Sequence, residues 1–286
     1  TTVPTVKTRF IEFIKKWPTL EDLAKTTEPK ILKFWSGLGY YSRARNLLKA
    51  AKIIDKNFNS KIPNKYDDLI SLPGIGDYTA KAIMGIGYNA SVMPLDANID
   101  RMFARIYALN KPLIKIKKQL LEKSKNFCSK QKASNLIQSF MDYGSLICTP
   151  RNPNCSICGI QKFCLAYEKN IQNKIPVKLK IQKIKSEKFT RAYVLINEKK
   201  EILVRIRSPK GMLASMLEVP NDDWEEKKIL LTKDKFIRKT KLKFKKKGIL
   251  TYPFSHFNLS AEIFYAQIYK KNFPHQKWLN LSKYNS

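Results

Sequence analysis

Four cysteines close together in the sequence carry the clearest chemistry of the chain. They are spaced C-x6-C-x2-C-x5-C, at Cys148, Cys155, Cys158 and Cys164. Thiolates at such intervals can converge on one metal centre. Zinc sites usually combine two well-separated C-x2-C pairs, whereas this segment has one such pair flanked by single cysteines. The spacing therefore predicts a metal site held by one short segment, and Cys128, which stands apart, is expected to be a bystander.

A glycine turn lies further upstream, in the sequence Leu-Pro-Gly-Ile-Gly at residues 72–76. Its two glycines, Gly74 and Gly76, permit a tight turn and allow the backbone to approach another molecule closely. The N–H groups that open the following helix could then hold a phosphate. Alone, such a turn is more often only a connection between two helices, so its meaning depends on its neighbours.

One carboxylate, Asp96, precedes a segment with apolar residues at helical spacing, at Ile99, Met102, Phe103 and Ile106. Two compatible interpretations fit it. As a plain N-cap, Asp96 would stabilise the helix by about 1 kcal/mol. As a functional anion at a helix N-terminus, it would offset positive charge that develops on a sugar ring. We favour the functional interpretation because the glycine turn lies upstream.

The charge balance of the chain indicates a polyanionic partner. The 286 residues include 55 Lys and Arg against 23 Asp and Glu, which gives a net charge of +32. Neutralisation of phosphates drives the binding of basic proteins to nucleic acids. The alternative is a lysine-rich composition imposed by an AT-rich genome. No apolar run is long enough to span a bilayer, so we expect no membrane partner.

The hydrophobic pattern divides the chain into two domains. Residues 1–164 show apolar residues at helical spacing, interrupted by Pro and Gly. Residues 165–187 are lysine-rich, lack a core pattern and are expected to be a linker. Short β-branched runs follow, which predict a smaller α+β domain built on a sheet over 188–286. Helices are expected at 7–16, 20–26, 29–36, 42–57, 65–71, 78–87, 97–109, 115–127 and 131–147, and strands at 192–196, 202–206 and 261–268, the first two as a hairpin.

Together, the turn, the aspartate and the cysteines resemble the helix–hairpin–helix glycosylases of the endonuclease III superfamily, which repair DNA. Two further stretches, FWSGLGYYSRARNL at 34–47 and MDYGSLICTP at 141–150, are similar to the MutY-type adenine DNA glycosylases within it. The resemblance covers nearly the whole chain. It implies an all-α helix–hairpin–helix domain over 1–164, with a 4Fe–4S cluster bound by the four cysteines of the loop 148–164.

The resemblance also implies roles for individual residues. The catalytic group would be Asp96, Tyr78 and Asn98. Bifunctional members carry a lysine at the position of Tyr78, and its amine forms a Schiff base that leads to strand cleavage. Tyrosine has no such amine, so a monofunctional glycosylase is expected. Leu38 and Tyr40 would wedge into the duplex beside the lesion, although alone they indicate only a tight loop between helices.

Further contacts with DNA are implied for the glycine turn and the cysteine loop. Gly74 and Gly76 would hold a backbone phosphate, and Arg151 is placed to meet another. The cluster itself is expected to be structural, since it fixes the loop that carries this arginine.

The second domain resembles the Nudix-like domain of the same family, notably at 211–214 and 217–220. Nudix hydrolases hold magnesium on a helix with clustered glutamates, and no such cluster follows, so diphosphate hydrolysis is not expected. Phe254, Ser255 and His256 match the family's lesion-reading loop. A serine hydroxyl both donates and accepts hydrogen bonds. It therefore suits the N7–H and O8 that distinguish 8-oxoguanine from guanine.

The sequence departs from the family in two respects. Asp96-Ala97-Asn98 stands where the family usually has Asp-Gly-Asn. The family's catalytic glutamate, the general acid for adenine N7, lies on a helix just before the segment that matches the start of this chain. The chain also stops before a final helix of the family. We therefore expect a fragment that binds DNA better than it cleaves glycosidic bonds.

The resemblance implies a base-excision repair enzyme that hydrolyses the N-glycosidic bond of adenine. Its expected partner is double-stranded DNA with A:8-oxoguanine or A:G mispairs. We expect a monomer in the bacterial cytoplasm, at the nucleoid. One alternative is an endonuclease III-like pyrimidine glycosylase with lyase activity, which Tyr78 and the domain 188–286 disfavour. The other is a non-catalytic binder of damaged DNA, which the missing glutamate would favour.

Overall fold

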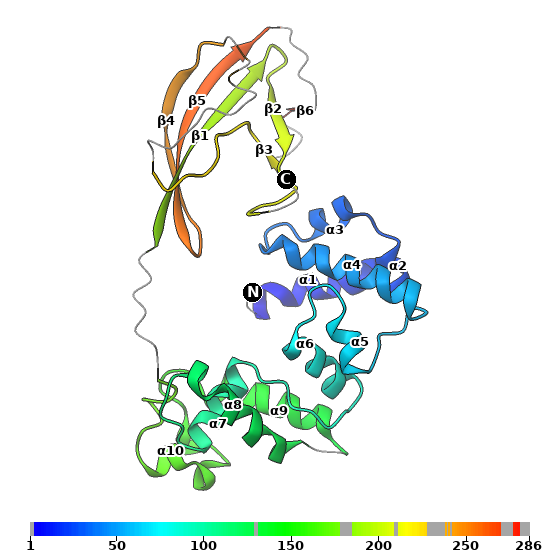
Figure 1. Cartoon of the computed structure of the whole chain (residues 1–286), viewed down its shortest axis with the longest axis vertical. Helices are drawn as coiled ribbons and strands as arrows, with labels where there is room; N and C mark the ends of the chain where they lie inside the picture. The colour runs from blue at the N-terminus through cyan, green and yellow to red at the C-terminus, as the bar shows by residue number, and fades with distance from the viewer. Residues whose placement is uncertain are drawn as a thin grey trace. The chain divides into compact units, whose positions relative to one another are not determined.

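The computed structural model of the chain consists of two compact units, Thr1–Lys180 and Ile181–Ser286. Figure 1 shows a helical first unit and a second unit built on strands. The described residues are 3–128, 131–177, 185–208, 211–227, 238, 240, 242–269 and 277–280.

The first unit contains the helices that the periodicity predicts, with ends shifted by a few residues. The expected helix over 78–87 divides in two, because its second half winds as a π-helix, η1. The helices are α1 Val3–Lys16, α2 Leu20–Ala24, α3 Glu28–Phe34, α4 Tyr41–Asn57, α5 Tyr66–Ile70, α6 Asp77–Ala82, η1 Ile83–Gly87, α7 Ala97–Ile106, α8 Leu113–Ser124, α9 Ala133–Leu146 and α10 Leu165–Glu168, with short 3-10 turns at Lys125–Phe127, Cys155–Ile157 and Gln161–Phe163.

The helices α1 to α6 pack around two neighbouring apolar clusters. Phe13, Trp17 and Phe34 meet edge to face or tilted, with ring centroids 5.2 to 5.8 Å apart. Such pairs add stabilisation beyond the area that they bury. Helix α2 begins with a capping box, in which Thr19 and Asp22 bond reciprocally to each other's backbone N–H groups. The ring contacts join the end of α1 to α3, and the buried Leu72 packs the start of the glycine turn into the second cluster.

Helix α7 is the centre of the remaining helices. Its residues 99–105 are all buried, because α8, α9 and α10 surround it. The approach of α9 is close: a Cβ on Gly144 would lie 2.8 Å from the Cβ of Asn98. Only glycine allows this distance. The N-terminal end of α7 is therefore fixed firmly against α9.

The expected linker over 165–187 is wrong at both ends. Residues 165–168 form α10, and Ala166 and Ile175 are buried in the core of the first unit. Val177 makes a bridge to Pro112. At the other end, Ser186 already opens the first strand. The lysines of this stretch obscured the few apolar residues that tie it to the core.

The second unit is a mixed sheet of six strands in the described residues. Its order is β3-β2-β1-β5-β4, and β6 pairs with β2. The long central strands β1 and β5 run parallel, with Tyr193 opposite Phe264. The expected hairpin is confirmed, since β1 pairs antiparallel with β2. The strands are β1 Ser186–Asn197, β2 Glu201–Ile206, β3 Leu217–Glu218, β4 Lys245–Pro253, β5 Phe257–Ile268 and β6 Lys277–Asn280.

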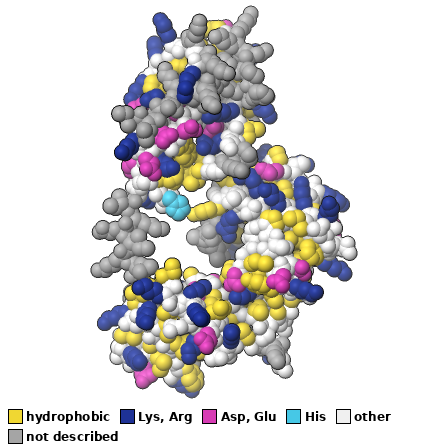
Figure 2. All heavy atoms as spheres, in the orientation of Figure 1, with side chains coloured by type: hydrophobic (Ala, Val, Ile, Leu, Met, Phe, Trp, Pro, Cys, Tyr) yellow, Lys and Arg dark blue, Asp and Glu magenta, His cyan; other side chains and the backbone are white. Residues whose placement is uncertain are grey.

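The surface agrees with the composition. Figure 2 shows Lys and Arg side chains spread over both units, with fewer Asp and Glu between them. In the described part of the chain, no helix combines the length and apolar character needed to cross a membrane.

Candidate active site and iron–sulfur site

Asp96 caps the N-terminus of α7. Its Oδ1 accepts hydrogen bonds from the backbone N–H groups of Asn98 at 2.9 Å and Ile99 at 2.7 Å. Its Oδ2 accepts from the side-chain amide of Asn98 at 3.1 Å. The cap interpretation of the sequence is therefore confirmed, and the carboxylate has one fixed orientation. Three donors and the helix dipole all favour negative charge at this point.

Asn98 links this carboxylate to the cysteine loop through Arg101. The Asn98 Oδ1 accepts from Arg101 Nη2 at 3.0 Å, while Arg101 Nε donates to the carbonyl of Cys148 at 2.7 Å. Arg101 also donates to the carbonyl of Gly144 on α9. Burial lowers the pKa of the Arg101 guanidinium, because it removes water from a charged group. The network joins the start of α7, the end of α9 and the first cysteine.

Tyr78 lies on α6 close enough to Asp96 for their charges to interact. Burial, and then the Asp96 carboxylate, raise the pKa of the Tyr78 phenol, so the ring stays neutral and can donate a hydrogen bond. Tyr78 is 43% exposed, which leaves it accessible. The nearest lysine along the helix, Lys81, pairs with Asp77 at 2.8 Å.

The glycine turn is shaped by Gly74. Its φ is +81°, and a Cβ there would lie 2.7 Å from the Cβ of Asn46 on α4. Both the conformation and the close packing require glycine. Gly76 differs, because it is extended, precedes α6 and has open space where a side chain would be. This side of the turn is free to approach another molecule.

The loop before α4 presents Tyr40. Gly37, Gly39 and Tyr40 all have positive φ, and the indole N–H of Trp35 donates to the carbonyl of Gly39 at 3.0 Å. Tyr40 is 65% exposed in this left-handed conformation, which is unusual for a bulky residue. Leu38 is half-buried. The loop therefore holds Tyr40 outward, and the role of either residue in DNA remains a prediction.

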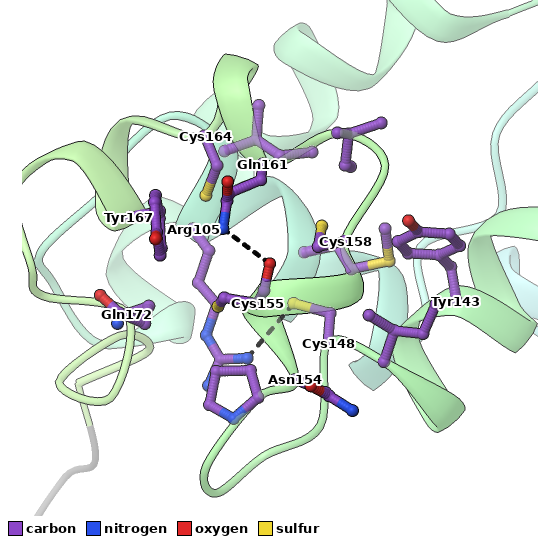
Figure 3. A pocket seen from close by; sticks show the side chains of 15 residues that line it. Arg105, Tyr143, Cys148, Asn154, Cys155, Cys158, Gln161, Cys164, Tyr167 and Gln172 are labelled. Atoms are coloured by element: carbon purple, nitrogen blue, oxygen red, sulfur yellow. Dashed lines mark hydrogen bonds between the residues drawn. The ribbon is translucent and has the colours of Figure 1, made fainter.

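The four cysteines line one pocket (Figure 3). Burial raises the pKa of the Cys155 and Cys164 thiols, and the neighbouring cysteines raise it further. A cationic iron–sulfur cluster would offset the repulsion between neighbouring thiolates, because metal ligation stabilises the thiolate form of cysteine. Within the described residues, no three His, Cys, Asp or Glu side chains are grouped tightly enough for a single ion. Four sulfurs around one pocket fit a cluster that gives each thiolate its own iron.

Two arginines of α7 hold this loop, and the sequence analysis missed both. Arg101 and Arg105 are buried, and they are four residues apart on one face of the helix. Arg105 Nη1 donates to Cys148 Sγ at 3.2 Å and to the carbonyl of Thr149 at 2.7 Å. The signal was the i, i+4 spacing of two arginines within an apolar helix pattern. Arg151 is exposed, and its carbonyl accepts a hydrogen bond from Thr149.

The turn between β4 and β5 carries the expected lesion-reading residues. Ser255 and His256 are exposed at its tip, and the Phe254 N–H donates to the carbonyl of Phe257 at 2.9 Å. Phe254 stacks on Phe257, with ring centroids 4.9 Å apart, and lies beside Trp224. The aromatic contacts fix the base of the turn and leave the polar tip open.

The sequence was then compared with known proteins. Residues 1–138 match the HhH-GPD superfamily of base excision DNA repair proteins, and residues 148–164 match the iron-sulfur binding domain of endonuclease III. The adenine DNA glycosylase of Buchnera aphidicola subsp. Schizaphis graminum is 34% identical over 280 residues, which cover 97% of this chain and 80% of that protein. The chain belongs to the adenine DNA glycosylase family. It is therefore a DNA glycosylase with a 4Fe–4S binding loop, as the sequence analysis expected.

Two further similarities agree with the family. The adenine DNA glycosylase of Buchnera aphidicola subsp. Baizongia pistaciae is 40% identical over 170 residues, which cover 59% of this chain and 48% of that protein. The structure of a thermostable thymine-DNA glycosylase is similar with a TM-score of 0.53 and 30% identity, over 59% of this chain and 79% of that one. The predicted fold class, a helical glycosylase domain followed by a smaller domain built on a sheet, is confirmed.

Proposed function

We propose that this protein removes adenine from double-stranded DNA by hydrolysis of the N-glycosidic bond, and that it acts on adenine opposite 8-oxoguanine or guanine. The observation that carries the proposal is the Asp96 carboxylate, fixed by three hydrogen bonds at the N-terminus of α7 beside Tyr78. Such a group can stabilise the cation that forms on a sugar when the base departs. The proposal places the work of the protein on chromosomal DNA, as a monomer.

Asp96 acts through charge and position. When the bond between adenine and deoxyribose breaks, positive charge develops on the sugar ring. A carboxylate that is already oriented needs no reorganisation to stabilise that charge, which is the most effective form of electrostatic catalysis. The carboxylate can also attack the sugar and form a covalent intermediate, as in retaining glycosidases. Water then completes the reaction and leaves an abasic site.

Tyr78 supports a monofunctional reaction. A phenol cannot form a Schiff base with the sugar, and its raised pKa keeps it protonated as a hydrogen-bond donor. Lys81 is engaged by Asp77. Borohydride reduction should therefore trap no adduct between this protein and DNA, and a trapped adduct would favour the lyase alternative.

The second unit supports recognition of 8-oxoguanine. Ser255 is exposed at the tip of a turn whose base is fixed by Phe254 and Phe257. Its hydroxyl can donate to one atom of a purine and accept from another. 8-Oxoguanine offers such a pair at O8 and N7–H, whereas guanine has only an acceptor at N7. Ser255→Ala should thus reduce the preference for A:8-oxoguanine over A:G pairs.

A single-turnover assay tests the proposed function. Duplexes with A:8-oxoguanine, A:G and A:T pairs are incubated with the chain as printed and with the family's upstream helix placed before Thr1. Abasic sites are then cleaved by alkali and counted. In the form that carries the upstream helix, we expect product from the first two duplexes and little from A:T. Tight binding to A:8-oxoguanine without product in both forms would instead support a non-catalytic binder.

A further inference from the structure

Arg105 is a charged side chain in an unusual place. It is 1% exposed and lies in the middle of α7. Its Nε donates to the carbonyl of Ile175 at 2.9 Å, and its Nη groups donate to the carbonyls of Thr149 at 2.7 Å and Pro150 at 3.4 Å. Its remaining partner is the Sγ of Cys148, at 3.2 Å from Nη1. Figure 3 shows the guanidinium among the cysteines, with this contact as a dashed line.

Among these partners, the Cys148 sulfur is the one that would carry negative charge once it binds iron, and so would balance the charge of Arg105. A buried cation is costly when no anion lies beside it. In the part of the chain that the structure describes, the hydrogen-bond partners of Arg105 are three neutral carbonyls and one sulfur. Only the sulfur can become negative, and cysteines that bind iron do so as thiolates. The guanidinium is thus matched to the metal-bound form of Cys148.

We propose that Arg105 is a positioning residue of the iron–sulfur site that also sets the reduction potential of the cluster through its hydrogen bond to the Cys148 sulfur. The inference rests on the 4Fe–4S assignment and not on the adenine glycosylase reaction. A nearby cation and a hydrogen bond to a ligating sulfur both stabilise the form of a cluster that carries more negative charge. That form is the reduced one. Arg105 should therefore raise the reduction potential and make loss of an electron harder.

Arg101 provides a matched control on the same helix. It is also buried and is one turn away, but it reaches Cys148 through the backbone carbonyl, at 2.7 Å from Nε. Both arginines hold the loop, so both should affect how much cluster the protein retains. Only Arg105 contacts the sulfur. A larger change in potential on loss of Arg105 than on loss of Arg101 would separate the effect of the hydrogen bond to the sulfur from support of the loop and from nearby charge alone.

The test measures the potential of the cluster in the whole protein. Arg105→Gln keeps a donor but removes the charge, while Arg105→Lys keeps the charge. Voltammetry on DNA-coated electrodes gives the one-electron potential of the loaded fraction, and oxidation by ferricyanide, which accepts one electron from the cluster, gives the rate of loss. We expect Arg105→Gln to shift the ratio of reduced to oxidised cluster about tenfold toward the oxidised form, equivalent to about 59 mV. Arg105→Lys should shift it less, and Arg101→Gln, which removes a nearby charge but no hydrogen bond to the sulfur, should also shift it less than Arg105→Gln.

A potential in Arg105→Gln equal to that of the unmodified protein would overturn the proposal, even if less cluster were bound. If a variant binds no cluster, a second measurement, on the unmodified protein, still tests the proposal. Protein labelled with ¹⁵N-arginine is brought to a paramagnetic state of the cluster, and pulsed EPR detects nitrogen coupled to the electron spin. Coupling to a guanidinium nitrogen is expected because Nη1 lies 3.2 Å from the ligand sulfur. Its absence would show that the hydrogen bond does not reach the cluster, and would likewise overturn the proposal.

Discussion

Replacement of Asp96 can separate the observed capping of α7 from the proposed stabilisation of the sugar cation. Asparagine caps helices about as well as aspartate. In Asp96→Asn the side-chain oxygen can still accept from the N–H groups of Asn98 and Ile99, which lie 2.9 and 2.7 Å from Oδ1. The variant loses the bond to the Asn98 amide, worth about 1 kcal/mol, together with the negative charge. Asp96→Ala loses these and the cap, worth about 1 kcal/mol more.

The two variants should therefore differ in stability and agree in activity. A helical unit of this size loses about 2–4 °C of Tm per kcal/mol, so Asp96→Asn should melt slightly lower than the parent and Asp96→Ala lower again. Loss of one oriented electrostatic group typically costs about 10²–10³-fold in rate. Single-turnover excision of adenine should fall by at least that factor in both. Differential scanning fluorimetry and a quenched-flow glycosylase assay measure the two effects on the same preparations.

A control comes from Asp22, another carboxylate in the first turn of a helix in the same unit. It belongs to the capping box of α2, so Asp22→Asn should lower stability without changing the excision rate. Asp96→Asn with the excision rate of the parent would refute the role of Asp96 as the charge that stabilises the sugar. Equal Tm values for Asp96→Asn and Asp96→Ala would refute the capping geometry.

Three further predictions concern the helical unit. Gly144→Ala should destabilise the unit by about 1–3 kcal/mol and lower the excision rate, because the new Cβ would lie 2.8 Å from that of Asn98. Urea unfolding and the glycosylase assay measure the two effects. An unchanged unfolding midpoint would contradict the close contact. Burial raises the pKa of Asp100 despite its ion pair with Lys117, so the folded state binds protons more readily than the unfolded state. The stabilisation from a protonated Asp100 is complete below the pKa of an unfolded aspartate, about 3.9, and is lost as the pH rises through the raised pKa of the folded state. Asp100→Asn should therefore lose stability relative to the parent as the pH falls from neutral to about 4; urea unfolding at the two pH values checks this, and a constant difference would argue against it. Cys164→Ala should abolish the brown absorbance of the cluster and lower the Tm of the unit, and a variant that kept its full iron content would exclude Cys164 as a ligand.

The helices of the first unit could be predicted because each buries one face at a regular spacing. The cap role of Asp96 also follows from local sequence, since an aspartate before an amphipathic run is a common helix start. Its neighbours across the fold could not be predicted in this way. Arg101 bonds to Asn98 within α7, but the other segments that Arg101 and Arg105 hold lie 43 to 70 residues away, where carbonyls and a sulfur accept. Nothing in the spacing of α7 itself reveals those partners.

Strand β4 and helix α10 were not predicted from the sequence, because they lack the usual contrast between apolar and polar positions. All residues of β4 are exposed, and it opens with three lysines, so no alternation marks it as a strand. Helix α10 is only four residues long and begins at a cysteine of the metal loop. The lysine-rich stretch that follows is attached to the core mainly through Ile175, a single apolar side chain. The lysine content therefore predicted a linker, whereas the structure shows this segment packed against the core of the first unit.

Helix α7 fixes the spacing between the candidate active site at its N-terminus and the cysteine loop that binds the iron–sulfur cluster. Asp96 caps its N-terminus, and the guanidinium groups of Arg101 and Arg105 donate hydrogen bonds to the loop that carries the cysteines. Each residue of an α-helix advances the axis by about 1.5 Å and turns it by about 100°. Inserting or deleting one residue between Asp96 and Arg105 would swing one end away from its partners while the other stayed engaged. We therefore expect relatives of this protein to keep the length of this interval.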